Sequence, residues 1–299
     1  MTMATIISTF NGEKYIEEQL VSIVNQTKKI NKIYIFDDCS KDRTVEIVKR
    51  VLSHVDIQIE IIENKRNKGW KLNYIDALKY VREDIIFLAD QDDIWMPNKV
   101  EVMSGIMEKY TEINVLTSNY ELLFSEDSTT EKIAEERRLS KDGKLMKVVQ
   151  KDTNFYVRQP GCSFCVRKTF FDKYFEGWND YMPHDAFLWK TALLTGTLYS
   201  INRPLFKWRR HSSNESNRKK ITREDRIREV KSDYIYINHM RNTIDNNYFL
   251  SKAYSFNNLR NEMFKKNSVI YWIRLFWQYR KFYVSFRSCM GDLYFLLKE

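Results

Sequence analysis

The chain has 299 residues, of which 43% are hydrophobic and 30% are charged. This composition can form a buried core and excludes a wholly disordered chain, and the length predicts about two domains. Lys and Arg outnumber Asp and Glu by 49 to 40, a net charge of +9. Residues 1–202 hold 28 basic and 31 acidic residues, whereas residues 203–299 hold 21 and 9. The basic excess therefore belongs to the last third.

Short apolar segments alternate with amphipathic ones over the first 120 residues. Strands are predicted at residues 5–8, 33–36, 57–62, 85–89 and 115–118. Helices are predicted at residues 15–25, 40–52 and 72–81, and from residue 96 onward. Such an alternation is typical of an α/β fold with a mostly parallel sheet and helices on both faces. Ligands of these sheets bind beyond the carboxyl ends of the strands.

The pattern changes after residue 124. Residues 125–152 are rich in charge and weakly periodic, and we expect a surface loop there. Strands are predicted at residues 161–166 and 197–201, with a helix between them that begins after His184. From about Thr222 the pattern is helical to the end. We expect one domain over residues 1–215 and a helical extension over residues 216–299.

Several classes of protein are disfavoured. The longest stretch without charge, residues 191–202, is shorter than the ~20 residues that span a bilayer. No signal-peptide pattern precedes the first strand. The four cysteines form no disulfide framework, and the pair Cys162 and Cys165 lies in an apolar run, where thiols act as small hydrophobic groups. These features predict a cytoplasmic protein without a zinc site.

Acidic residues follow two of the predicted strands. Asp37 and Asp38 end the second strand, and Asp90, Asp92 and Asp93 end the fourth. In a doubly wound sheet both groups face the same crevice. Crowded carboxylates repel one another unless a cation or hydrogen-bond donors compensate them, and carboxylate oxygens suit Mg²⁺ or Mn²⁺. A solvated acidic loop is the alternative, which two such strand ends in one sheet disfavour.

Seven segments, in this order, resemble glycosyltransferase family 2. They are residues 6–15 (IISTFNGEKY), 22–27 (SIVNQT), 37–44 (DDCSKDRT), 67–69 (NKG), 88–95 (LADQDDIW), 183–186 (PHDA) and 209–214 (RRHSSN). The resemblance covers about residues 3–215, and the last three segments are similar to its rhamnosyltransferase-like subset. It implies the GT-A fold, which is Rossmann-like, and a nucleotide-sugar donor.

The resemblance also implies roles for the matched residues on the donor side. Ser8, Asp38 and Asn67 would lie beside the nucleotide base and ribose, with Asp38 accepting the N–H of a pyrimidine ring. Asp90 would contact the ribose or the diphosphate.

On the reaction side, Asp92 would bind the divalent metal, Mn²⁺ or Mg²⁺, and His211 would approach that metal or the diphosphate. Asp185 would be the general base. Each of these has a structural alternative: Asp185 fits as an acid in the first turn of a helix, and His211 as a surface histidine in a basic loop. Trp95 can stack on a sugar or pack in the core, and packing is favoured.

The function implied is that of an inverting, metal-dependent glycosyltransferase. It would move a sugar, with rhamnose or another hexose as candidates, from a UDP- or dTDP-linked donor to a saccharide acceptor in cell-surface polysaccharide synthesis. A sugar-phosphate nucleotidyltransferase is the rival enzyme, but residues 8–13 after the first strand lack the glycine-rich basic loop expected of it. A non-catalytic saccharide-binding scaffold is disfavoured because Asp38, Asp92 and Asp185 are all present.

The C-terminal region is basic and aromatic, with ten aromatic residues in residues 269–297. On one helix a polar stripe of Arg274, Gln278, Lys281, Ser285 and Ser288 would lie opposite Trp272, Phe276, Tyr279 and Tyr283. Such a helix suits an anionic membrane surface, where a lipid-linked acceptor would lie at the inner face of the cell membrane. Packing on the catalytic domain or in a homodimer is the alternative. No nucleic-acid-binding motif is present, and we expect no nucleic-acid partner.

Overall fold

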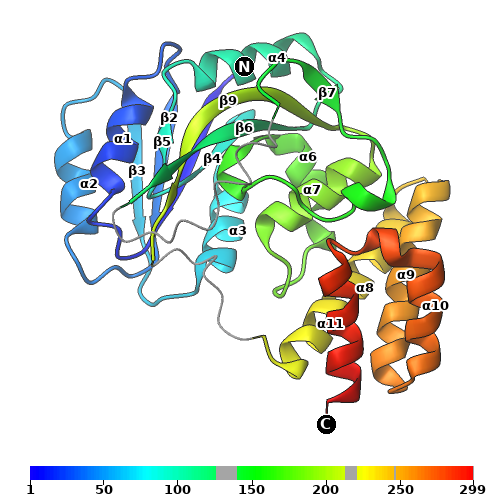
Figure 1. Ribbon diagram of the computed structural model, residues 1–299. Coiled ribbons are helices and arrows are strands. Elements are labelled where there is room, and N and C mark those ends of the chain that lie inside the picture. The colour runs from blue at the N-terminus through cyan, green and yellow to red at the C-terminus, as the bar shows by residue number, and fades with distance from the viewer. Residues whose placement is uncertain (126–139, 213–220, 246, 299) are drawn as a thin grey trace. The chain divides into compact units, whose positions relative to one another are not determined.

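The apolar segments expected to form strands do so in the computed structural model, which describes residues 1–125, 140–212, 221–245 and 247–298 (Figure 1). The chain divides into two compact units. The first comprises residues 1–147, 159–173 and 198–217, and the second comprises residues 148–158, 174–197 and 218–299. This division differs from a single boundary after residue 215, because two earlier segments group with the C-terminal helices.

The strands of the first unit form one sheet, nine-stranded within the described residues, in the order β3-β2-β1-β4-β8-β6-β9-β5 with β7 paired to β9. They are β1 (Met3–Thr9), β2 (Lys32–Asp37), β3 (Gln58–Glu63), β4 (Ile85–Asp90), β5 (Ile94–Trp95), β6 (Val115–Phe124), β7 (Leu145–Lys147), β8 (Phe164–Arg167) and β9 (Leu198–Arg210). The first four are mutually parallel, whereas β8 runs antiparallel to both β4 and β6. The expected mostly parallel sheet is therefore confirmed.

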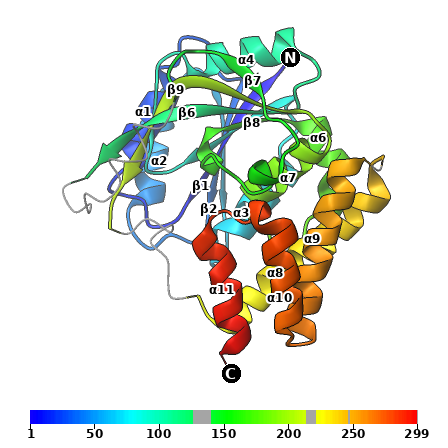
Figure 2. The same ribbon diagram turned by 45° about the vertical axis from the view of Figure 1, so that its right-hand side comes forward.

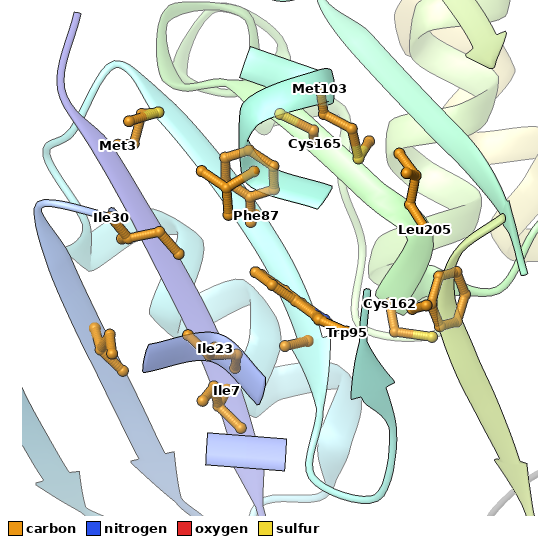
Figure 3. Close-up of a cluster of buried hydrophobic side chains, with 14 of the residues drawn as sticks. Met3, Ile7, Ile23, Ile30, Phe87, Trp95, Met103, Cys162, Cys165 and Leu205 are labelled. Atoms are coloured by element: carbon orange, nitrogen blue, oxygen red, sulfur yellow. The ribbon is translucent and has the colours of Figure 1, made fainter. Parts of the chain in front are cut away.

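Helices of the first unit cover both faces of this sheet. They are α1 (Ile16–Val24), α2 (Thr44–Leu52), α3 (Trp70–Tyr80), α4 (Lys99–Lys109) and α6 (Lys168–Tyr174, whose last residue belongs to the second unit). Apolar residues of α1, α2 and α4 share one core cluster with alternate residues of β1 and β4, such as Ile7 and Phe87 (Figure 3). Helix α3 contacts β1 and β2 and lies on the other face. Strands covered on both faces are mostly apolar on both sides, as β4 is, which explains the continuous apolar runs in the sequence.

Three details of the first unit refine the sequence predictions. Residues 126–139 of the expected surface loop lie outside the described residues, and the remainder includes β7. The strand predicted at 197–201 continues to Arg210, because its second half pairs with β5 and β6. Trp95 is only 2% exposed and packs against Phe87, so the packing alternative is confirmed.

The second unit is helical. Its α-helices are α7 (His184–Leu194), α8 (Arg223–Thr243), α9 (Tyr248–Lys265), α10 (Val269–Tyr279) and α11 (Phe286–Leu297). Thr222 and Asp225 form a capping box at the start of α8, so the start predicted near Thr222 is confirmed. Among the described residues, no helix combines the length and apolar character needed to cross a bilayer.

The single polar stripe expected along residues 274–288 is wrong, because the helix is interrupted between α10 and α11. Phe282 and Tyr283 turn inward at the interruption: Phe282 stacks on Phe256 of α9 with ring centroids 4.9 Å apart, and the Tyr283 hydroxyl donates to Asp292 at 2.9 Å. Ser285 then caps α11 by accepting the backbone N–H of Ser288 at 3.1 Å. Burial of two aromatic rings thus outweighs helix continuity here.

A buried ionic network joins α11 to α9. The Asp292 carboxylate is fully buried and accepts from Arg260 Nε at 2.6 Å and Nη2 at 3.0 Å. Arg260, 1% exposed, also donates to the Tyr156 hydroxyl at 3.0 Å. A bidentate pair of this kind compensates two charges that water cannot reach.

We expect Asp292→Asn to lower the free energy of unfolding by about 3–5 kcal/mol, because it leaves the Arg260 guanidinium buried without a counter-charge. Urea unfolding followed by circular dichroism measures the change. Glu262→Gln on α9 is the matched control, since its partners Lys265 and Lys266 are exposed and such surface ion pairs are worth at most about 1 kcal/mol. Equal effects of the two substitutions would contradict a stabilising role for the buried pair.

Candidate functional site

The carboxyl ends of β1, β2 and β4 meet at one edge of the sheet. Ser8 near the end of β1 pairs with Phe36 on one side and with Asp90 on the other. Neighbouring strands lie about 4.8 Å apart, so the residues that follow β2 and β4 flank the end of β1. The structure therefore brings Ser8, Asp38 and Asp90 to the same edge.

Asp38 is buried and holds the loop of residues 64–69. Its Oδ1 accepts from the backbone N–H of Lys68 at 2.8 Å and from the Asn64 amide at 3.0 Å, and its Oδ2 accepts from the N–H of Gly69 at 2.8 Å. Gly69 has a φ of +83°, which only glycine adopts easily. Asn67 is exposed at the tip of this loop, where its Oδ1 accepts the Gly69 N–H at 3.0 Å.

Asn73 connects that loop to the strands, and the sequence analysis missed it. Its amide donates to the Ser8 hydroxyl at 2.7 Å and to the Phe36 carbonyl at 2.8 Å, while its Oδ1 accepts from Asn64 at 2.8 Å. Asn73 is fully buried. A polar side chain on the apolar face of the predicted helix, one turn before Ala77, was the signal that could have revealed it.

The two side chains expected to bind a metal lie next to each other, Asp92 after β4 and His211 after β9. His211 Nε2 lies 2.8 Å from Asp92 Oδ2, although 119 residues separate them along the chain. Both side chains are largely covered, with 8% and 16% exposed. Asp90 is half-buried, and its Oδ1 accepts from the hydroxyl of Tyr74, a residue of α3 that sequence reasoning also missed, at 2.7 Å. Asn214 of the same motif lies outside the described residues.

Asp93 differs from its two acidic neighbours. Its Oδ1 accepts the backbone N–H of Arg209 at 3.0 Å, and its buried Oδ2 has no hydrogen-bond partner among the described residues. Burial, followed by the charges of Asp92 and Asp90, raises the pKa of Asp93 well above the usual value. The raised pKa disfavours a third negative charge beside Asp90 and Asp92, which reduces the repulsion expected among these carboxylates.

Arg209 fixes the loop from the end of β9. Its Nε donates to the Asp92 carbonyl at 2.7 Å, and its guanidinium pairs with Glu18 of α1. The same group lies over the Tyr15 ring, 4.7 Å from the centroid. These contacts connect the end of β9 to the loop after β4 and to α1.

The donor chemistry of this edge fits Mg²⁺ or Mn²⁺. Asp90, Asp93 and Cys162 have ligand atoms within 4.8 Å of one another, the one such cluster among the described residues. Burial raises the pKa of both Asp93 and Cys162, which disfavours the ionised forms that bind a metal, and a thiol also suits softer metals. The Asp92 carboxylate and the His211 imidazole, 2.8 Å apart, form the better pair for a hard cation.

Asp185 lies in the second unit, in the first turn of α7. It is half-buried, and its Oδ1 accepts the backbone N–H of Ala186 at 2.7 Å. A carboxylate is stabilised there by the N-terminal end of the helix. The preceding His184 is buried, which lowers its pKa to about 4 against the opposing charge of Asp185. The imidazole is therefore neutral near pH 7.

A depression of about 400 Å³ lies elsewhere in the first unit, lined by Ile30, Asn31 and residues 55–58. These residues precede β2 and β3, so the depression is at the amino ends of the strands. Parallel sheets bind their ligands at the opposite edge, and we assign the depression no role.

A parallel sheet with polar and acidic side chains at the carboxyl ends of neighbouring strands defines a Rossmann-like α/β protein, in which this edge is the expected place for a ligand. Comparison with known proteins is consistent with this class. Residues 5–175, more than half of the chain, match the family Glycosyl transferase family 2. The chain therefore belongs to that family, as the sequence motifs indicated.

Curated relatives include enzymes named for two nucleotide sugars. The chain is 28% identical over 221 residues to the dTDP-rhamnosyl transferase RfbG of Shigella flexneri, a match that covers 70% of this chain and 73% of RfbG. It is 31% identical over 121 residues to UDP-Glc:alpha-D-GlcNAc-diphosphoundecaprenol beta-1,3-glucosyltransferase WfgD of Escherichia coli. This match covers 40% of this chain and 46% of WfgD. EpsE of Bacillus subtilis is 29% identical over 124 residues, and the chain spans 44% of its length.

Solved structures share the fold at lower identity. TarS residues 1–349 of S. aureus, in complex with UDP-GlcNAc, superpose with a TM-score of 0.68 at 14% identity, covering 88% of this chain and 73% of TarS. The mannosyltransferase PcManGT of Pyrobaculum calidifontis, in complex with GDP-Man and Mn2+, superposes with a TM-score of 0.53 at 15% identity. This match covers 91% of this chain and 74% of the PcManGT chain. The expected GT-A architecture with a helical C-terminal region is thereby confirmed.

Proposed function

We propose that this protein is an inverting, metal-dependent glycosyltransferase that uses a nucleoside diphosphate sugar as donor. The observation that carries the proposal is the edge at which β1, β2 and β4 end, where Asp38, Asp90 and the Asp92–His211 pair gather. Membership of Glycosyl transferase family 2 supports the reaction class.

The donor nucleotide is a pyrimidine nucleotide, UDP or dTDP, in this proposal. Ser8, Asp38 and Asn67 bind its base and ribose. The Asp38 carboxylate has about four acceptor positions. The Asn64 amide and the backbone N–H groups of Lys68 and Gly69 occupy three of them, which leaves one for the ring N–H of a pyrimidine. Two similar proteins agree with these nucleotides: RfbG is named as a dTDP-rhamnosyl transferase, and TarS was solved in complex with UDP-GlcNAc.

Asp92 and His211 hold a Mn²⁺ or Mg²⁺ ion, and Asp90 contacts the ribose or diphosphate beside it. When bound, the ion supplies positive charge for the departing diphosphate. Tyr74 orients Asp90 through its hydrogen bond, and Arg209 keeps the backbone of residues 92–93 in place.

Asp185 is the general base. The oxygen of the acceptor hydroxyl bonds to the anomeric carbon while the bond from that carbon to the diphosphate oxygen breaks, and the hydroxyl proton passes to the Asp185 carboxylate. The Ala186 N–H holds that carboxylate through its other oxygen. We place the acceptor among saccharides of cell-surface polysaccharides, lipid-linked at the cytoplasmic face of the membrane. The diphosphoundecaprenol in the name of WfgD supports a lipid-linked acceptor.

Thermal unfolding of the full chain with UDP, dTDP or GDP, each with Mn²⁺, tests the donor, since a ligand of the folded protein raises the melting temperature. We expect a shift with UDP or dTDP and none with GDP. The corresponding nucleotide sugars are then assayed for release of nucleoside diphosphate, with and without saccharide acceptors. Release of pyrophosphate from a nucleoside triphosphate and a sugar phosphate would establish the nucleotidyltransferase instead, and binding without turnover of any donor would establish the scaffold.

A further inference from the structure

Helix α10 exposes apolar side chains on the side opposite its packed face. Ile270 and Trp277 are each 70% exposed and Ile273 is 47% exposed. These three residues are spaced by three and four positions and so form one stripe. Leu275, on the other side of the helix, is buried. A helix that is apolar on both sides and packed on one leaves the other face uncovered by the residues that the structure describes.

Helix α11 has the same property. Phe286, Tyr294 and Leu297 are 67%, 57% and 64% exposed, whereas Cys289 and Leu296 are buried. The two helices touch, because Trp272 Nε1 of α10 donates to the Cys289 carbonyl at 3.1 Å and the rings of Phe276 and Phe286 lie 6.3 Å apart. Figure 2 shows α10 and α11 next to one another. We call the six exposed apolar residues of these paragraphs (Ile270, Ile273, Trp277, Phe286, Tyr294, Leu297) the α10–α11 surface.

The charges around this surface are of one sign. Five exposed basic residues belong to the same segment: Arg274, Arg280, Lys281, Arg287 and Lys298. Asp292 is the only acidic residue between 263 and 298, and its charge is buried and neutralised by Arg260. A partner for this segment must therefore offer both an apolar region that can bury these side chains and negative charge for the basic residues.

We propose that the α10–α11 surface binds an anionic lipid bilayer, with its apolar side chains at the level of the headgroups and its basic side chains on lipid phosphates. Aromatic and aliphatic residues beside Lys and Arg are the composition of helices that lie in a membrane interface. A second copy of the chain is a poorer occupant. In a two-fold contact through this face, the five cations of one copy would face the same five cations of the other, and like charges repel. Membrane binding by this surface is independent of the reaction at the strand ends.

The test is flotation of the full chain with vesicles of phosphatidylcholine alone or with phosphatidylglycerol added. We expect recovery with the anionic vesicles, loss of recovery at high salt, and little with phosphatidylcholine. Arg274→Gln/Lys281→Gln/Arg287→Gln is expected to weaken binding to anionic vesicles about a hundredfold. Lys79→Gln/Arg82→Gln/Lys109→Gln, which removes three exposed cations from the first unit, is the matched control and should bind as the unchanged protein does.

A second variant tests the apolar residues. Ile270→Ser/Ile273→Ser/Trp277→Ser should lower binding by about tenfold or more, while Tyr248→Ser, at an 83% exposed position of α9, should not. Circular dichroism verifies that each variant is folded. Deletion of the segment is avoided because it would strip Arg260 of Asp292. Equal recovery of unchanged protein with both vesicle types, or a dimer in light scattering that the α10 variant dissociates without any vesicle binding, would overturn the proposal.

Discussion

Asp92→Ala is expected to weaken the Mn²⁺-dependent binding of UDP or dTDP by about a hundredfold or more. The substitution removes the carboxylate that lies 2.8 Å from His211 and, with it, the negative charge that a divalent cation requires at this edge. Titration calorimetry of each nucleotide, with Mn²⁺ and with a chelator, measures the metal-dependent part of the affinity. The chelated affinity should change little, since Ser8, Asp38 and Asn67 are untouched.

Glu108→Ala is the matched control for Asp92→Ala. Glu108 is an exposed acid near the end of α4 and pairs only at the surface with Lys28, so its loss removes one negative charge without touching the strand ends. Both variants should keep the circular dichroism spectrum of the unchanged protein. Metal-dependent affinity that survives in Asp92→Ala would remove Asp92 from the metal site and leave Asp90 as the carboxylate to examine next.

Asp185→Asn should lower the rate of sugar transfer by between about a hundredfold and ten-thousandfold and leave nucleotide binding unchanged. The amide oxygen can still accept the Ala186 N–H, so the side chain keeps its place while losing the ability to take a proton. Single-turnover rates with saturating donor and acceptor, together with the calorimetric affinity for UDP or dTDP, separate the two effects.

Asp180→Asn is the control for that measurement, because Asp180 is exposed in the turn five residues earlier. Its transfer rate should match that of the unchanged protein. If Asp185→Asn turns over at a near-normal rate, Asp185 is a first-turn acid of α7 with a structural role only. The two variants Asp92→Ala and Asp185→Asn together distinguish a failure of donor binding from a failure of proton transfer.

Elements with a strong local pattern were predictable. The alternation of apolar runs and helices located β1, β2 and β4, and strands that run parallel have their carboxyl ends at one edge of the sheet. Ser8, Asp38 and Asp90 could for this reason be assigned to a common edge without coordinates. The family that matches residues 5–175 was also recognisable from short motifs. The burial of Trp95 in the core was likewise predicted from its local sequence.

Contacts between distant segments were not predictable in this way. The meeting of His211 with Asp92, and of Arg209 with the backbone of that same loop, depends on where β9 ends in the sheet. Asn73 looked like an ordinary helix residue until the fold placed it against Ser8. The break between α10 and α11 arises because Phe282 and Tyr283 find partners in α9 and α11.

The chain's residues alone determined the α/β class, the family motifs, the acidic strand ends and the basic, aromatic C-terminal third. These are properties of short segments, whose periodicity and composition do not depend on the rest of the chain. Only the tertiary structure decided that the pKa of Asp93 is raised, since burial and the charges of Asp92 and Asp90 act on it. It also decided which aromatic residues of α10 and α11 are covered and which face solvent, because burial and electrostatic fields depend on three-dimensional neighbours that sequence distance does not specify.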